Sequence, residues 1–254
     1  MSESEPLPEE QSFLSHLFEL RARLLRMVAT ILAFAVLLLP FSSKIYTLFA
    51  DPMMAQLPVG SSMIAVEVAS PFLAPFKMTL MLAVFLSVPV ILYQAWSFVA
   101  PGLYRNEKRI AIPILISSSV LFYVGCAFAY FVVFPLVFAF FSAAAPEGVT
   151  VAPDISHYLS FMLVLFFAFG AAFEVPIVVF ILIASGITTP ASLAAKRPYV
   201  IVGAFALGML LTPPDIISQT LLALPMWVLF EAGILASRLL LGKRIAEQAA
   251  ATED

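Results

Sequence analysis

An uncharged apolar stretch of 32 residues, 110–141, limits what this chain can fold into more than any other feature of its sequence. The hydrocarbon core of a bilayer is about 30 Å thick, and a helix of about 20 apolar residues crosses it. Over the whole chain, 62% of the residues are apolar and only 11% are charged. Because about a quarter of the residues of a soluble domain are charged, the sequence predicts a polytopic membrane protein.

Six apolar stretches predict six transmembrane helices and an all-α fold. Strands of a membrane barrel would alternate polar and apolar residues over about ten positions, and the sequence shows no such alternation. We divide the chain into an amino-terminal segment, 1–23, a transmembrane domain, 24–241, and a tail, 242–254. The predicted spans are 24–41, 72–98, 110–141, 155–184, 198–211 and 216–230.

The first span has an alternative interpretation as a signal peptide, with Arg21, Arg23 and Arg26 as its basic region. Its apolar run is longer than the usual signal core of roughly 7–15 residues, and no A-x-A cleavage site follows it. We therefore interpret it as a membrane helix.

Basic residues are concentrated on one side of the predicted spans. Eleven of the 13 Lys and Arg residues flank the start of span one, the end of span six and the second and fourth connections, whereas Lys44 and Lys77 fall on the other side. Cytoplasmic loops carry an excess of basic residues. We therefore predict that both termini and the loop 99–109 are cytoplasmic, and that 42–71 and 142–154 lie outside.

Span lengths and prolines predict a cupped bundle. Spans five and six have 14 and 15 residues, which reach only about 21–23 Å as helices, so this short pair would thin the bilayer locally. A proline inside a helix removes one backbone donor and tends to bend the helix. Such prolines lie in spans two, three, four and six, as Pro89, Pro135, Pro176 and Pro225.

Glu174 lies inside span four, which contains no basic residue. A charge near the bilayer centre costs at least about 2.5–3.5 kcal/mol, so this side chain should face protein or water, or carry a proton. A functional polar site in a hydrated concavity and a protonated side chain that only links helices both remain open. Gln219 in span six is a weaker candidate, because amides often bond one helix to another.

Glu19 and Glu107 are carboxylates among basic neighbours on the predicted cytoplasmic side. Glu19 lies four residues before Arg23, and Glu107 precedes Lys108 and Arg109, so local ion pairs explain both. A carboxylate also binds a partner's guanidinium through two parallel hydrogen bonds. The residues alone do not choose between these interpretations.

Catalytic and cofactor motifs are absent from the sequence. It contains no G-x-x-x-x-G-K-[ST], H-E-x-x-H or G-x-S-x-G. One cysteine, Cys126, permits no internal disulfide, and His16 and His157 are too few for a two-haem cytochrome. A formal net charge of −3 without a large basic surface argues against nucleic-acid binding. We expect no enzyme, cofactor or metal, but a transporter, channel, translocase or scaffold.

A series of motifs runs in order along nearly the whole chain. They are HLFELRARL at 16–24, SPF at 70–72, PVILYQ at 89–94, FVVFP at 131–135, YLSF at 158–161, FEVP at 173–176, KRPY at 196–199 and LTPPD at 211–215. Together with Phe98, Tyr104 and Glu107, this ordered set resembles the TatC family, a subunit of twin-arginine protein translocases.

The resemblance implies a glove-shaped receptor in the bacterial inner membrane. It would bind signal peptides with paired arginines and, with TatA- and TatB-like single-span subunits, export folded proteins on the proton-motive force. A homo-oligomer within a larger complex, surrounded by membrane lipid, is also implied.

Carried over by motif, Glu19 and Glu107 would receive the arginine pair, with Phe98 in the same region. A second set would serve translocation or partner contact: Pro52, Glu174, Asp215 and Gln219. Two other functions stay open. A proton-coupled small-solute transporter would use Glu174 as its carrier, and a structural scaffold would need neither set of carboxylates.

Overall fold

The computed structural model describes residues 8–54, 63–99, 108–143, 152–211 and 216–250, and these residues are almost entirely helical. This result confirms the all-α prediction. The elements are α1 (Pro8–Leu38), a 3-10 turn (Leu39–Phe41), α2 (Ser42–Met54), α3 (Ser70–Val99), α5 (Lys108–Phe128), a π turn (Ala129–Val133), α6 (Phe134–Ala143), α7 (Ile155–Phe173), α8 (Val175–Ala184), α9 (Pro190–Ala195), α10 (Arg197–Leu211) and α11 (Ile216–Ala250).

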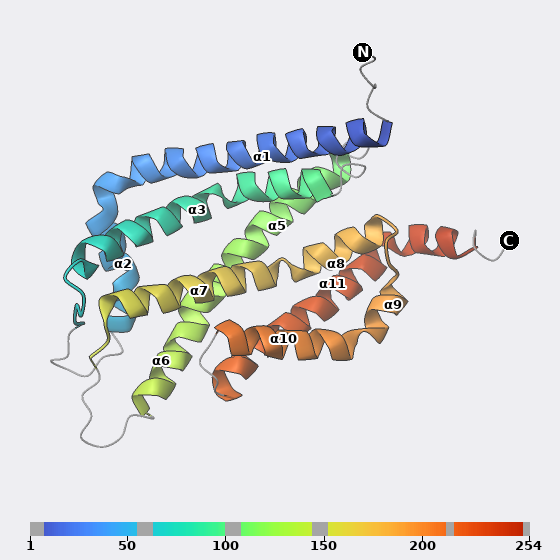
Figure 1. Cartoon of the computed structure of the whole chain (residues 1–254). Helices are drawn as coiled ribbons and strands as arrows, with labels where there is room; N and C mark the ends of the chain where they lie inside the picture. The colour runs from blue at the N-terminus through green and yellow to red at the C-terminus, as the bar shows by residue number, and fades with distance from the viewer. Residues whose placement is uncertain (1–7, 55–62, 100–107, 144–151, 212–215, 251–254) are drawn as a thin grey trace, which may run out of the picture.

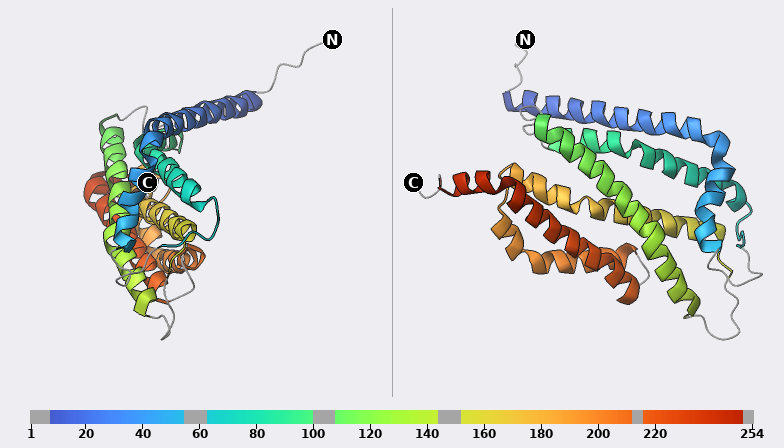
Figure 2. Two further views of the ribbon diagram at one scale, coloured as in Figure 1. Left: turned by 90° about the vertical axis from the view of Figure 1, so that its left-hand side faces the viewer. Right: turned by 180° about the vertical axis from the view of Figure 1, so that it is seen from behind.

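The helices form an elongated bundle with two distinct ends (Figure 1). We call the end that carries the start of α1 and the end of α11 the terminal face; α3 and α8 also end there. The far face is the opposite end, where α3 and α7 begin. Helices α5 and α6 cross the bundle obliquely on one side, as the view from behind shows (Figure 2).

Each predicted span coincides with an apolar helix. Among the described residues, five helical stretches are long and apolar enough to cross a membrane, and α10 adds a shorter apolar helix over Arg197–Met209. Helix α10 has 15 residues, or about 22 Å of helix, as expected for span five. The end of α10 and the start of α11 stop well short of the far face that α3 and α7 reach (Figures 1 and 2).

The predicted end of span six, at residue 230, is wrong. Helix α11 continues without interruption through Glu231 to Ala250, and its apolar span reaches Gly242. The physical reason is an ion pair: Arg197 at the start of α10 binds both carboxylate oxygens of Glu231, with Nη2 2.8 Å from Oε2. A paired carboxylate need not end an apolar helix, and its partner lies 34 residues away in the sequence.

The first predicted outer loop begins with a helix that the sequence analysis did not identify. Pro40 lies in the 3-10 turn that ends α1, and α2 then leaves at a steep angle (Figure 1). Helix α2 packs against α3 and α6.

At two of the four prolines predicted to bend a helix, the α-helix is interrupted. Pro135 follows the π turn, in which the N–H of Phe134 bonds to the carbonyl of Ala129. Pro176 follows the break between α7 and α8. Helices α3 and α11 continue through Pro89 and Pro225.

Helices α5 and α7 approach closely through two glycines. A Cβ atom on Gly125 would lie 2.5 Å from the carbonyl oxygen of Phe169, and one on Gly170 would lie 2.5 Å from the ring of Phe122. Such small residues let membrane helices pack at short distance. Buried aromatic rings fill the core beside this contact; among them Phe85 meets Phe122 and Phe166 edge to face.

Candidate functional site

At the terminal face, Glu19 of α1 pairs with Arg23 one turn further along. Arg23 Nη2 lies 2.6 Å and Nε 3.2 Å from Glu19 Oε1. The structure therefore contains the local ion pair that the spacing allowed. The Glu19 side chain is 43% exposed and that of Arg23 only 15%, so the carboxylate faces outward and the guanidinium inward.

Arg23 also bridges to α3. Its Nη1 lies 3.2 Å from Gln94 Oε1 and 3.4 Å from the Gln94 carbonyl oxygen. Gln94 is buried. Gln94 was not among the predicted site residues, because its contact with Arg23 spans 71 residues of the sequence and has no local signal.

Phe98 lies four residues after Gln94 in α3 and is half-buried. Residues four apart share one side of a helix. The Arg23–Gln94 contact therefore links Glu19 to the helical turn that leads to Phe98. Glu107 lies outside the described residues.

Glu174 lies at the break between α7 and α8, with its side chain buried among three helices. Ser118 of α5 donates a hydrogen bond to Glu174 Oε2 at 2.5 Å, and Trp96 Nε1 of α3 donates to Ser118 Oγ at 3.0 Å. Glu174 Oε1 is buried without a hydrogen-bond partner in the part of the chain that the structure describes. The sequence identified Glu174 but not Ser118 or Trp96.

The other predicted translocation residues lie elsewhere. Gln219 of α11 is half-buried where α11 packs closely on α10, and a Cβ atom on Gly208 would lie 3.5 Å from its Cα. Pro52 lies in α2, and its side chain is not among those that the structure describes. Asp215 falls outside the described residues.

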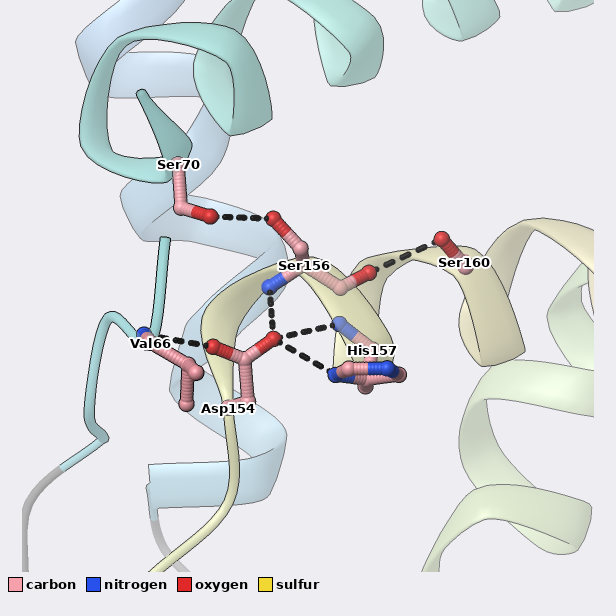
Figure 3. Close-up of polar contacts among 6 residues, drawn as sticks. All are labelled: Val66, Ser70, Asp154, Ser156, His157 and Ser160. Atoms are coloured by element: carbon pink, nitrogen blue, oxygen red, sulfur yellow. Dashed lines mark hydrogen bonds and ion pairs between the residues drawn. The ribbon is translucent and has the colours of Figure 1, made fainter. Parts of the chain in front are cut away.

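A clasp at the far face joins the segment before α3 to the start of α7 (Figure 3). Asp154 Oδ2 accepts from the backbone N–H of Val66 at 3.0 Å, and its Oδ1 accepts from the N–H groups of Ser156 and His157 at 2.9 Å. Ser70 Oγ lies 2.7 Å from Ser156 Oγ. The hydrogen bond from Val66 is the main reason why the pKa of Asp154 falls to about 2.

The sequence analysis did not predict this clasp. Asp154 stands directly before an apolar run, which is typical of a helix N-cap. Its hydrogen bonds with Ser156 and His157 could therefore have been predicted from the sequence. The contact with Val66 spans 88 residues and has no local signal.

Comparison with known proteins decides the family. The family model for the Sec-independent protein translocase protein TatC matches residues 15–225. The chain belongs to the TatC family. It is 58% identical over 226 residues to the TatC protein of Azotobacter chroococcum mcd 1, with 89% of each chain covered. It is 55% identical over 235 residues to that of Escherichia coli strain K12, covering 92% of this chain and 91% of the relative.

A solved structure agrees with this assignment. The crystal structure of a twin-arginine translocase receptor TatC superposes with a TM-score of 0.77 at 37% identity, covering 88% of this chain and 98% of the other. The sequence-based resemblance to the TatC family is thus confirmed. This TatC-family chain is a polytopic membrane protein of twin-arginine protein transport, and its family is a translocase component rather than a catalytic enzyme family.

Proposed function

We propose that this TatC-family chain is the receptor subunit of its translocase. In this proposal, its terminal face binds the paired arginines of signal peptides on the cytoplasmic side of the bacterial inner membrane. The chain assembles with TatA- and TatB-like single-span subunits and with further copies of itself, and the complex exports folded proteins on the proton-motive force.

The observation that carries the proposal is the placement of Glu19. Its carboxylate is outward-facing and held at one oxygen by the inward Arg23. A carboxylate accepts a guanidinium through two parallel hydrogen bonds, whereas an ammonium acts as a point charge. Glu19 therefore suits a ligand that presents the guanidinium of an arginine better than one that presents the ammonium group of a lysine.

Glu107 and Phe98 complete the proposed receptor. Phe98 lies near the end of α3, on the side of the helix that Arg23 ties to α1. Glu107 directly precedes α5, whose start lies at the same terminal face. We assign both residues to recognition on the family match.

A second region would serve translocation and partner contact. Glu174, Gln219, Pro52 and Asp215 are the residues proposed for it. The short α10, against which Gln219 of α11 packs, would thin the bilayer on one side. The buried, unpartnered Oε1 of Glu174 suits a donor brought by the single helix of a partner subunit.

The test is titration of a paired-arginine peptide against membranes that contain the purified chain. Truncating one partner of a charged hydrogen bond costs about 1.5–3 kcal/mol, or about 10- to 150-fold in affinity. We expect the Glu19→Ala, Glu107→Ala double variant to show such a loss, at its lower end because Glu19 is exposed. Replacing the peptide's arginines by lysines should weaken wild-type binding and reduce the effect of the variant.

Glu67→Ala is the matched control, because Glu67 is an exposed carboxylate three residues before α3, which begins at the far face. This variant should bind the peptide like the wild type. Tight binding of the arginine peptide by the double variant, at equal protein level, would show that recognition lies elsewhere.

A further inference from the structure

Arg23 is the side chain that joins the two helices of the proposed receptor. All three nitrogens of its guanidinium make contacts: Nε and Nη2 with Glu19 on α1, and Nη1 with Gln94 on α3. A guanidinium is a planar group with five donors in a fixed fork, so one Arg can hold acceptors on two helices at once.

Helix α1 packs along α3, but the side chains of α1 around Arg23 are at most half-buried. No side chain of α1 between Leu17 and Phe34 is buried, and among the described side chains of this helix the first buried one is Ala35. Leu20, Leu24 and Leu25 around Arg23 are all exposed. The polar bridge through Arg23 is therefore a specific tie between the two helices where Glu19 lies.

We propose that Arg23 and Gln94 are positioning residues for signal-peptide recognition. They hold the carboxylate of Glu19 in a fixed place relative to the end of α3, which carries Phe98, and they thereby set the preference for arginine over lysine. The inference rests on the proposed receptor function and names two residues that act through Glu19 rather than by touching the peptide.

Positioning is favoured over competition between Arg23 and the incoming arginine. Arg23 is mostly buried and its partner Gln94 is 6% exposed, so releasing Arg23 would leave buried polar groups unpaired. Both contacts of Arg23 with Glu19 go to Oε1. A carboxylate has about four acceptor positions, so these two contacts do not by themselves make Arg23 a competitor of a peptide guanidinium.

Two single variants remove the bridge from opposite sides. Arg23→Lys keeps the charge but loses the fork, and Gln94→Leu keeps the volume but loses the side-chain acceptor. We expect each to weaken binding of the paired-arginine peptide about three- to tenfold. Binding of the lysine peptide should change less, so the ratio of the two affinities should fall.

The reciprocal variant Arg23→Gln, Gln94→Arg presents the guanidinium from α3 and should recover part of the arginine preference. Arg26→Lys is the matched control, because Arg26 is an exposed basic residue of the same helix, and it should leave the ratio unchanged. Equal accumulation of all variants in the membrane is required for the comparison, and Gln94→Leu carries the test if Arg23→Lys does not accumulate.

Three results would overturn the inference. Tighter binding by Arg23→Lys or Gln94→Leu would mean that Arg23 competes with the peptide. An equal loss for the arginine and lysine peptides would mean that the bridge only supports the fold. Unchanged peptide binding by Arg23→Lys and Gln94→Leu, while Glu19→Ala still weakens binding, would mean that Glu19 recognises the peptide without help from Arg23 and Gln94. If Glu19→Ala itself has no effect, the inference fails at Glu19, and the Glu19→Ala, Glu107→Ala double variant then decides whether the receptor function fails as well.

Discussion

At Glu174 the chain places a carboxyl group between three apolar helices. One oxygen accepts from Ser118, and the other is buried without a partner among the described residues. An unpaired buried polar group costs about 1–3 kcal/mol, so folding alone does not favour glutamate here. We expect the carboxyl group to serve a contact made during transport.

The variants Glu174→Leu and Glu174→Gln distinguish a contact made during transport from a role in helix packing. Leucine is of similar size but offers no acceptor, whereas glutamine keeps an oxygen for Ser118 and a polar group for a partner. We expect at least about tenfold slower export of a paired-arginine precursor with leucine and a smaller loss with glutamine. Export is measured in cells that lack their own TatC, at matched protein level; wild-type export by the leucine form would mean that Glu174 only links helices.

Asp154 gives the far-face clasp a defined pH dependence. Its pKa falls from an ordinary 3.8 to about 2 in the folded chain, chiefly through the backbone N–H of Val66. A lowered acid pKa stabilises the fold above the unfolded value, and this stabilisation is lost as the pH falls through the folded value. The clasp should therefore hold above about pH 4 and weaken between about pH 4 and 2.

Amide hydrogen exchange at Val66 measures this effect. Exchange corrected for its intrinsic pH dependence should rise in the wild type between about pH 4 and 2. In Asp154→Asn, exchange at Val66 should be faster at neutral pH and should not rise further between about pH 4 and 2. An unchanged step in the Asn variant would assign the pH dependence to another group.

Some properties of the helices can be predicted from the sequence of one segment alone, and others cannot. The apolar runs and the shortness of α10 were predicted, because hydrophobicity and length are properties of one segment. The continuation of α11 past Glu231 was not, since it depends on Arg197, 34 residues away. The same reason hid Ser118 and Gln94, whose roles appear only once α1, α3, α5 and α7 lie together.

The close contact between α5 and α7 leaves no room for a larger residue at Gly125. A Cβ atom on Gly125 would lie 2.5 Å from a backbone oxygen of α7, which cannot move without displacing the helix. Overpacking of this kind costs about 1–3 kcal/mol, so Gly125→Ala should lower the thermal unfolding temperature in detergent. Gly203→Ala in α10, where no atom lies within 4 Å, should be neutral or slightly stabilising; equal behaviour of the two variants would refute the close approach.

Over the whole molecule, the two proposed working regions lie on different parts of one bundle. The proposed recognition residues Glu19 and Phe98 lie on α1 and α3, which run side by side to the terminal face (Figure 1). Glu174 is buried at the break between α7 and α8, and the short α10 ends before the far face (Figure 1). The basic residues of the sequence predicted which connections share a face. The meeting of α3 with both Arg23 and Ser118, through Gln94 and Trp96, required the folded arrangement.

Site-specific photocrosslinking shows whether a paired-arginine precursor binds at the terminal face. A photoreactive residue replaces Phe98, near the end of α3 at the terminal face, or, as control, the fully exposed Val68, two residues before α3 begins at the far face. Inverted inner-membrane vesicles then receive a precursor with paired arginines. We predict a crosslink from position 98 that disappears when lysines replace the arginines, and none from position 68. A crosslink from position 68, or one from position 98 that does not depend on the arginines, would contradict a twin-arginine receptor at the terminal face.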